Sequence, residues 1–315
     1  MSAAIHWDDV EGSRRTVGHL DSTWYDLGSA AGSRDVGVNR IRVEPGGWST
    51  PAHVEHGEEE IFYVLGGSGV SWQDEGPGEP RTHEVGPGDC IVHVTIGELH
   101  TLRAGPDGLG VLAFGQRALG SGAWLARAGI AWVGPTWTNV GEEPSPWERE
   151  AAAGAPELPA DASPRPANIV NAADVEAEAR EGATVARSRR DLATAAGSVR
   201  TGLKLVDVRP GKLGVAPHCH AAEEELFVVL EGSGDLLLGD EEIPVRAGHV
   251  VARPPGTGVA HTMRAGLDGL TYLAYGTRVP NDVCFYPRSG KVYLQGVGVI
   301  GRIEQLEYWD GEEIE

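Results

Sequence analysis

The chain has 315 residues and a formal net charge of −20, with 26 Lys and Arg against 46 Asp and Glu; this balance argues against a nucleic-acid partner, whose phosphates attract basic surfaces. No apolar run approaches the roughly 20 residues that a membrane-spanning helix needs, and the polar N-terminus lacks the apolar core of a signal peptide. Three cysteines with no disulfide-like spacing fit a reducing compartment, so we expect a cytoplasmic protein with no membrane or nucleic-acid partner.

The predicted elements of the first half are short strands. Segments such as IFYVLGG, CIVHVTI and GVLAFGQ are rich in β-branched and aromatic residues and are separated by Gly, Pro and Asp, a pattern typical of a β-barrel. A short helical piece is expected near Gly120–Ala128. Residues 139–168, rich in Pro, Ala and Glu, follow and predict an exposed connector.

The second half repeats the first. Three blocks align without internal gaps, namely 26–46 on 191–211, 58–69 on 223–234 and, after a shortened hairpin in the second copy, 100–117 on 261–278. A short helical piece is expected at Asp174–Arg180. A duplication that keeps its register over this length predicts an all-β chain of two similar barrels. We place them at residues 1–138 and 169–315, joined by the connector 139–168.

Residues with metal-binding chemistry are concentrated in the second copy. On an extended strand, side chains alternate between faces, so His218 and His220 project to one side and Cys219 to the other. Glu225 follows after a short turn, and His261 begins a later strand. Imidazole and carboxylate ligands together suit Fe(II), Mn, Ni, Co or Zn. The four residues therefore predict a metal site.

The first copy carries a variant of this set. His53, Glu60 and His100 align on the corresponding ligands, but Glu55 stands where the second copy has His220, with His56 beside it. Regular alternation places Glu55 at the site and gives two histidines and two carboxylates, which favours Mn or Fe. A β-bulge would bring His56 there instead. A barrel that has lost metal binding and is kept for packing is the third interpretation.

The candidate ligands resemble the first sequence motif of the cupin family, Gly-x5-His-x-His-x3–4-Glu-x6-Gly. His218, His220, Glu225 and Gly232 match its second to fifth positions. Lys212 stands where the motif has its first glycine.

The second cupin motif, Gly-x5-Pro-x-Gly-x2-His-x3-Asn, is similar to the segment that begins at Gly248 and contains Pro254, Gly256 and His261, with two extra residues before the histidine and no final Asn. The resemblance covers both copies and implies a two-domain cupin, or bicupin, with a jelly-roll barrel (double-stranded β-helix) in each half. It also implies a metal held in the mouth of a barrel by three histidines and one glutamate, with positions left open.

The sequence supports a function only at the level of class. We interpret the chain as a metal-dependent oxidoreductase of dioxygenase type, acting on a small oxygenated organic substrate. A non-redox isomerase, lyase or decarboxylase, and a non-catalytic cupin that binds a small molecule, are the alternatives, because the same fold supports all of them. The expected cofactor is a divalent metal, Fe(II), Mn, Ni or Zn; the expected partner is a small-molecule substrate, and a homo-oligomer is compatible with the sequence.

Overall fold

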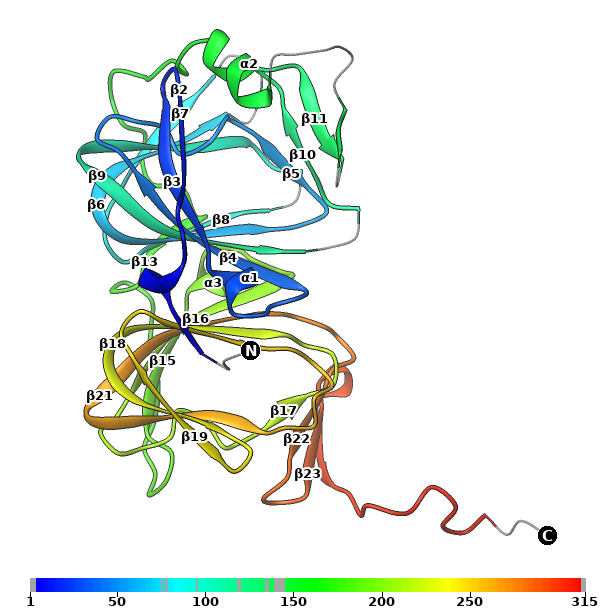
Figure 1. Ribbon diagram of the computed structural model, residues 1–315. Coiled ribbons are helices and arrows are strands. Elements are labelled where there is room, and N and C mark those ends of the chain that lie inside the picture. The colour runs from blue at the N-terminus through cyan, green and yellow to red at the C-terminus, as the bar shows by residue number, and fades with distance from the viewer. Residues whose placement is uncertain are drawn as a thin grey trace.

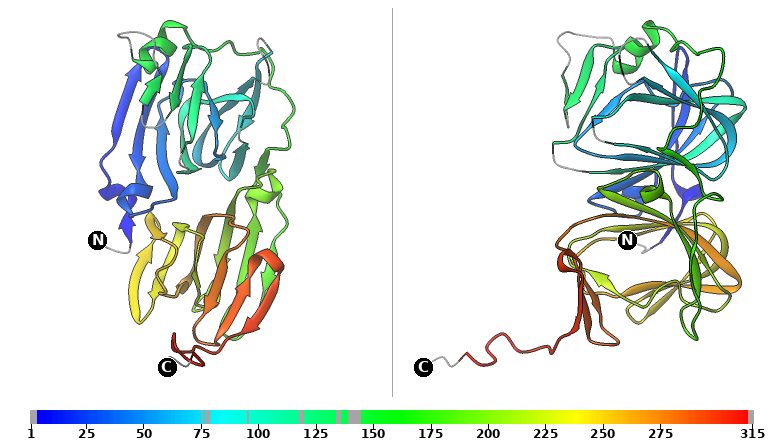
Figure 2. Two further views of the ribbon diagram at one scale, coloured as in Figure 1. Left: turned by 90° about the vertical axis from the view of Figure 1, so that its right-hand side faces the viewer. Right: turned by 180° about the vertical axis from the view of Figure 1, so that it is seen from behind.

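The computed structural model describes residues 4–74, 76, 79–94, 96–117, 120–133, 136–138 and 145–312. Two β-barrels lie one above the other, and the C-terminal residues leave the second barrel as an extended arm (Figures 1 and 2). The expected all-β duplication is confirmed. Among the described residues, no helix has the length and apolarity that a membrane crossing requires.

The first barrel consists of two sheets. One runs in the order β13-β8-β6-β9-β4-β3-β2, with β7 paired to β6, and the other in the order β12-β11-β10-β5. Its strands from the first repeat are β2 (Ser13–Val17), β3 (Leu20–Asp26), β4 (Val36–Val43), β5 (Val54–His56), β6 (Glu60–Asp74), β7 (Arg81–Val85), β8 (Asp89–His93), β9 (Leu99–Gln116), β10 (Gly122–Leu125), β11 (Ile130–Val133) and β12 (Thr136–Thr138).

The second barrel repeats this plan. Its larger sheet runs in the order β1-β20-β18-β21-β16-β15-β14, with β19 paired to β18, and its smaller sheet in the order β17-β22-β23-β24. Its strands from the second repeat are β14 (Glu178–Arg180), β15 (Arg187–Asp191), β16 (Thr201–Val208), β17 (Cys219–His220), β18 (Glu225–Leu238), β19 (Glu241–Arg246), β20 (His249–Arg253), β21 (His261–Thr277), β22 (Val283–Tyr286), β23 (Lys291–Leu294) and β24 (Val299–Arg302).

Each larger sheet takes its edge strand from the other repeat. Strand β1 (Ile5–His6), at the start of the chain, pairs antiparallel with β20 of the second barrel. Strand β13 (Ile169–Asn171), at the start of the second repeat, pairs antiparallel with β8 of the first barrel. The two barrels are therefore joined by reciprocal strand exchange, which pairs residues 249–250 of β20 and residues 89–91 of β8.

The barrels share a continuous apolar interface. Helix α1 (Leu27–Ala30) contacts β20 of the second barrel, and helix α3 (Leu192–Ala195) contacts β8 of the first. Figure 1 shows both helices between the barrels. The rings of Phe114 and Tyr275, which occupy equivalent positions in the two repeats, lie 5.0 Å apart in this interface. Because one buried cluster contains residues of both repeats, the two barrels pack as one body.

Two short segments differ from the expected helices. Gly120–Ala128 contains strand β10, which pairs with β5 and β11, and Asp174–Arg180 contains strand β14, which pairs with β15. Both helix predictions were wrong, because pairing with a neighbouring strand outweighs weak local propensity. The described α-helix outside the interface is α2 (Pro146–Ala152) in the connector, with a capping box formed by Ser145 and Glu148. Short 3-10 turns occur at η1 (Trp7–Asp9) and η2 (Gln295–Val297).

Steric crowding explains why the first cupin motif ends in glycine. Gly232 has a φ of 76° and lies where the pairing of β18 with β21 changes register. A Cβ atom at this position would lie 2.3 Å from the carbonyl oxygen of Gly269. Only glycine fits this bulge without displacing the neighbouring strand.

Candidate metal centres

The four predicted ligands of the second barrel come from different strands that meet at one end of it. His220 lies on β17, Glu225 begins β18 and His261 begins β21. His218 forms an antiparallel bridge with His261 just before β17. All four residues are buried or half-buried, and Cys219 is buried away from them, as strand alternation predicts.

One carboxylate oxygen lies at the centre of this group. Glu225 Oε2 is 2.8 Å from His261 Nε2, 3.4 Å from His220 Nε2 and 3.8 Å from His218 Nε2. His218, Glu225 and His261 have ligand atoms within 4.8 Å of one another. The structure thus brings together all four residues that the sequence singled out in this copy.

The second ring nitrogen of two histidines faces an acceptor. His218 Nδ1 lies 2.9 Å from the carbonyl oxygen of Ala216, and His220 Nδ1 lies 2.7 Å from Asp282 Oδ2. These oxygens accept, so in the neutral imidazoles the proton is on Nδ1 and each Nε2 turns a lone pair toward Glu225. Lone pairs directed at a carboxylate repel it unless a cation lies between them. The donor set therefore fits a divalent metal.

The pKa shifts of His218 and Glu225 agree with this arrangement, whereas at His220 burial is outweighed by the Glu225 and Asp282 carboxylates, which raise the pKa of that ring. Burial lowers the pKa of His218 to about 4, so the ring is neutral at pH 7. Burial alone would raise the pKa of Glu225, but the hydrogen bond to His261 and the nearby histidines lower it well below its ordinary value. Neutral imidazole and ionised carboxylate are the forms that bind metal.

Asp282 holds one of the candidate ligands and was not found from the sequence. Its carboxylate is fully buried and accepts hydrogen bonds from the Ala222 backbone N–H and the Gln295 side chain as well as facing His220. In the first repeat, the residue aligned with Asp282 is Ser121. A comparison of the repeats could have identified Asp282. The second repeat has this acid together with His220, whereas the first repeat has Ser121 together with Glu55. A second carboxylate behind Glu55 would repel it.

Cys284 also lies near this site. Its Sγ is within 4.8 Å of ligand atoms of His218 and His220. Burial raises the pKa of this thiol to about 12, so it is neutral at pH 7 in the metal-free protein. Ala123 occupies the aligned position in the first repeat, which makes Cys284 a second difference between the barrels.

The first barrel gathers a more acidic set. His100 Nε2 is 3.0 Å from Glu60 Oε2, and His53 Nε2 is 3.6 Å from the same oxygen and 3.2 Å from Glu55 Oε1. The structure places Glu55 beside the other candidates, whereas the neighbouring His56 is exposed. Strand β5 is regular at this point, since Glu55 and His56 pair with consecutive residues of β10.

Two further side chains extend the first site. The ring of His93 stacks on that of His100 with centroids 3.7 Å apart, and its Nδ1 is 2.7 Å from Glu98. Burial, together with Glu55 and Glu60, raises the pKa of Glu58 to about 8. Glu58 corresponds to Glu223 of the second barrel, so the additional carboxylate of the first site is Glu55, at the position of His220. Such a hard, oxygen-rich set suits Mn or Fe better than Cu.

A cavity of about 710 Å³ opens onto the second site. Its walls include the candidate ligands, the apolar side chains of Phe227 and Met263, and four cationic residues, Arg187, Arg189, Lys204 and Arg278. The side chain of Lys204 makes no hydrogen bond or ion pair with any residue that the structure describes. The cavity thus presents positive charge to whatever occupies it beside the ligands.

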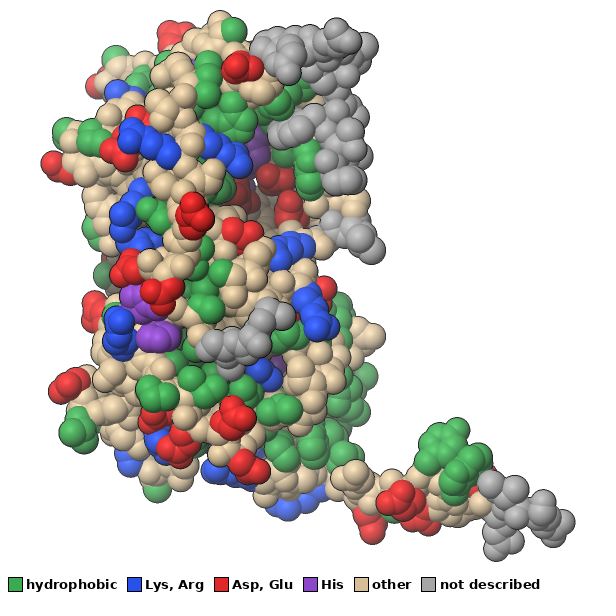
Figure 3. Space-filling model, viewed as in Figure 1, with side chains coloured by type: hydrophobic (Ala, Val, Ile, Leu, Met, Phe, Trp, Pro, Cys, Tyr) green, Lys and Arg blue, Asp and Glu red, His purple; other side chains and the backbone are tan. Residues whose placement is uncertain are grey.

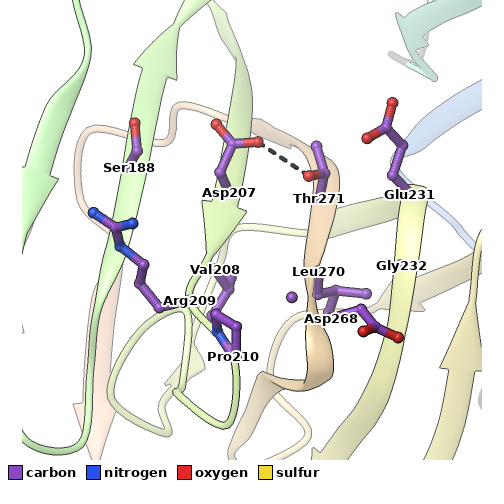
Figure 4. Close-up of a pocket in the computed structure, with 11 residues that line it drawn as sticks. Ser188, Asp207, Val208, Arg209, Pro210, Glu231, Gly232, Asp268, Leu270 and Thr271 are labelled. Atoms are coloured by element: carbon purple, nitrogen blue, oxygen red, sulfur yellow. Dashed lines mark hydrogen bonds between the residues drawn. The ribbon is translucent and has the colours of Figure 1, made fainter.

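A second hollow in the same barrel differs in character. It measures about 490 Å³ and is lined by parts of β15, β16, β18 and β21. Figure 4 shows Asp207, bonded to Thr271 at 3.0 Å, with Glu231 and Asp268 nearby. Asp207 and Ser188 occupy strand positions that alternate with those of Lys204 and Arg187, so they face away from the metal cavity. None of its described lining residues is a histidine, and we do not assign it to the site.

The sequence of both repeats matches the family model described as "Cupin domain", at residues 39–108 and 204–269. The barrels are therefore cupin domains, and the chain is a two-domain cupin protein. No protein with a curated description matches its sequence.

The solved structures that resemble the chain include bicupin oxalate decarboxylases. The Bacillus subtilis enzyme at pH 4.6 has 16% identity and a TM-score of 0.58, over 89% of this chain and 79% of that one. The Lactobacillus farciminis enzyme in its formate complex has 14% identity and a TM-score of 0.59, over 90% and 88%. A further structure of the B. subtilis enzyme, described with Mn(II) centres, has 15% identity and a TM-score of 0.57, over 89% and 80%. At these identities the similarity establishes the shared fold.

Proposed function

We propose that this protein is a metal-dependent lyase of decarboxylase type that acts on a small carboxylate in its second barrel. The observation that carries the proposal is one cavity that contains both a His/Glu donor set and an unpaired cation. A metal and a cation on one cavity can bind an anionic substrate at two points. The dioxygenase interpretation favoured by the sequence has less support, because the structures of similar fold named above are decarboxylases.

The cationic residues are directed to the cavity by the strands that carry them. Arg187 and Arg189 alternate with Ser188 on β15, and Lys204 faces the same interior from β16, opposite the direction of Leu203. The Arg187 guanidinium donates to the carbonyl oxygen of Gly214 at 2.9 Å, which fixes its position. The positions aligned with these three cations in the first repeat are Ser22, Trp24 and Asn39. The fourth cation, Arg278, aligns with Arg117, so three of the four cationic positions differ between the repeats.

In this proposal the candidate ligands of the second barrel bind the metal. His218, His220, Glu225 and His261 would hold it, and Mn is the first metal to test because the B. subtilis decarboxylase of similar fold is described with Mn(II) centres. When bound, such a metal supplies a Lewis acid that polarises a carboxylate oxygen.

The chain's own residues would contribute binding and charge balance. Lys204 and Arg187 neutralise the substrate carboxylate, and Phe227, Met263 and Tyr272 restrict water around it. In the reaction the bond between the carboxyl carbon and its neighbour breaks, CO₂ leaves, and the electron pair stays on the neighbouring carbon, which then takes a proton. The net reaction consumes no oxidant, in contrast to a dioxygenase reaction.

The proposal is tested with protein expressed in medium supplemented with Mn and, separately, Fe. Metal content is measured first, and CO₂ release and O₂ consumption are then followed with oxalate and a panel of small mono- and dicarboxylates. We expect CO₂ release without stoichiometric O₂ consumption. The matched variants are His218→Ala, which should abolish turnover, and the aligned His53→Ala, which should leave second-barrel turnover measurable.

Stoichiometric O₂ consumption with product formation would contradict the decarboxylase proposal and support the dioxygenase interpretation. Saturable binding of a carboxylate without turnover would indicate a binding protein. Protein that carries no metal after both expressions, or His218→Ala protein with full metal content, would overturn the assignment of the site itself.

A further inference from the structure

The connector helix α2 covers one end of the first barrel. Trp147, on this helix, packs against a buried cluster formed by Leu20, Trp48, Ala52 and Trp72. The guanidinium of Arg15 lies 4.8 Å from the centroid of the Trp147 ring, within the range of a cation–π contact. The helix therefore covers apolar side chains that would otherwise face solvent.

A second contact ties α2 to the segment directly before β5, next to the candidate ligand His53. Glu150 is fully buried, and the Arg127 Nε donates to its carboxylate at 2.7 Å. The carboxylate also interacts with the backbone of Ala52, the residue directly before His53. Helix α2 thus supports the first metal centre from behind, through one aromatic and one acidic side chain.

The second barrel repeats the surface that receives α2. The five positions aligned with the Trp147 environment are all apolar, namely Val185, Leu213, Pro217, Leu237 and Ala260. The bridge between Val185 and Leu213 corresponds to that between Leu20 and Trp48, which confirms the equivalence in structure. Leu213 is buried and the other four side chains are half-buried, whereas Leu20, Trp48, Ala52 and Trp72 are all buried in the first barrel.

The two arginines that hold α2 are also repeated. Arg180 aligns with Arg15, and Arg288 aligns with Arg127. Both are exposed, and neither side chain forms a hydrogen bond or ion pair with a described residue. The receiving surface of the second barrel therefore keeps its cations without the partners that they have in the first.

The C-terminal arm carries the matching segment. Trp309-Asp310-Gly311-Glu312 resembles Trp147-Glu148-Arg149-Glu150 in having tryptophan first, an acid second and glutamate fourth. Both segments follow equivalent strands at nearly the same distance along the chain, because β11 ends at Val133 and β23 ends at Leu294. In this structure the arm extends away from the barrel with apolar and acidic side chains on its surface (Figure 3), and Trp309 is 60% exposed.

We propose that residues 303–312 dock onto the end of the second barrel of their own chain. Trp309 would cover the apolar positions around Leu213 and lie beside Arg180, and the Glu312 carboxylate would pair with Arg288. The own chain is the favoured occupant because the arm starts from the barrel that carries the surface, with a connecting segment about as long as the one before α2. The inference is independent of the reaction proposed above.

The docked arm would not copy helix α2 in every contact. A Cβ atom on Gly18 would lie 2.8 Å from the Cβ of Ala151, so the first barrel needs glycine where α2 crosses it. The aligned residue in the second repeat is Ala183. The arm must therefore cross this point farther from the barrel, while Trp309 and Glu312 still reach their partners. Pro217, the residue directly before His218, would then be covered as Ala52 is.

Hydrogen exchange of the full-length protein, followed by mass spectrometry, tests this proposal. We expect the amides of residues 303–312 to exchange at least tenfold more slowly than in the W309A variant. R288E should remove the same protection, and the double variant R288E/E312R should restore most of it. L267A, which changes a 92% exposed apolar residue elsewhere on the barrel, is the matched control and should change nothing.

Equal exchange rates in the wild type and W309A would overturn the proposal. Protection that increases with protein concentration, together with a doubled mass by light scattering, would also overturn it, because the occupant would then be a second copy. All substituted residues are exposed, and unchanged protection of residues 146–152 in each variant reports that the chain is folded.

Discussion

Glu59 of the first repeat and Glu224 of the second make equivalent bonds in opposite directions across the interface between the barrels. The Glu224 carboxylate accepts backbone N–H bonds from Arg34, Asp35 and Val36 of the first repeat. The Glu59 carboxylate accepts bonds from the aligned segment of the second repeat, residues 198–201. Both carboxylates are almost completely buried, at 1% and 0% exposure. Each barrel thus satisfies backbone donors of the other.

Removal of either carboxylate should destabilise the joined barrels. Glu224→Ala leaves three backbone N–H groups without their buried acceptor, and an unsatisfied buried donor costs about 1–3 kcal/mol. We expect a loss of at least about 3 kcal/mol in the free energy of unfolding, measured by urea denaturation. Glu241→Ala, at an exposed acid of the same repeat, should change it by less than about 0.5 kcal/mol. A loss as small as that of Glu241→Ala would contradict the importance of these bonds.

The contribution of Glu59 should depend on pH. Burial alone would raise the pKa of Glu59, but hydrogen bonds from Ser198 and the backbone of Val199 and Arg200 lower it below its ordinary value. A carboxylate with a lowered folded pKa stabilises fully above its unfolded pKa, about 4.3, and loses this contribution as the pH falls through the folded value. The difference in unfolding free energy between the wild type and Glu59→Gln should therefore be constant near pH 7 and narrow below about pH 4. A difference that widens on acidification would contradict this.

Asp282 should act as a positioning residue for the second metal centre. Carboxylates that hold the far nitrogen of a ligating histidine commonly change metal affinity by about 10–100-fold. In a chain whose first site is disabled by His53→Ala, we expect Asp282→Asn to weaken metal binding and Asp282→Ala to weaken it further, measured by competition with a chelator. Ser121→Ala should leave binding at the second site unchanged. Equal affinity in all of these variants would remove Asp282 from this role.

The supporting role of an aspartate behind a histidine ligand can also be tested by introducing this pair into the first barrel. With the second site disabled by His218→Ala, Glu55→His should create a three-histidine set that lacks the carboxylate behind its new ligand. We expect the double variant Glu55→His/Ser121→Asp to bind Zn more tightly than Glu55→His alone, by up to about tenfold. Equal Zn affinity with and without Ser121→Asp would contradict this role. The presence of Asp282 with His220, and of Ser121 with Glu55, would then have another origin.

The cation in the cavity should control substrate affinity. Lys204 is directed to the cavity and has no partner among the described residues, so Lys204→Ala should raise the KM for the active carboxylate by about tenfold or more, as expected for the loss of a charged contact. Asn39→Ala, the aligned change in the first barrel, is the control and should leave the KM unchanged. Equal KM values for the wild type and Lys204→Ala would place the substrate elsewhere.

The sequence predicted those features that depend on local pattern or on the repeat. Strand alternation placed His218 and His220 on one face, as they lie in the structure. For the first site the sequence left Glu55 and His56 as alternatives, and the structure places Glu55 beside the other candidates and His56 at the surface. The four candidate ligands of the second set could be predicted together because their spacing follows two motifs. These features need only the period of a strand and a comparison of one copy with the other.

Features that arise from contacts between the repeats could not be predicted in this way. Strand β1 has two residues and pairs with a strand far along the chain, so no periodicity identifies it. Asp282 lies outside both motifs, and its role depends on the short distance to His220. The two expected helices failed for a related reason, since β10 and β14 owe their conformation to neighbouring strands.

The reciprocal strand exchange also sets an order for folding during synthesis. The first barrel cannot complete its larger sheet when residue 138 leaves the ribosome, because β13 (Ile169–Asn171) has not yet been made. Strand β1 is made first but must wait for β20 (His249–Arg253) near the end of the chain. Until then the free edge of β8 can pair with other nascent chains, so a fragment that ends at the connector should be prone to aggregate.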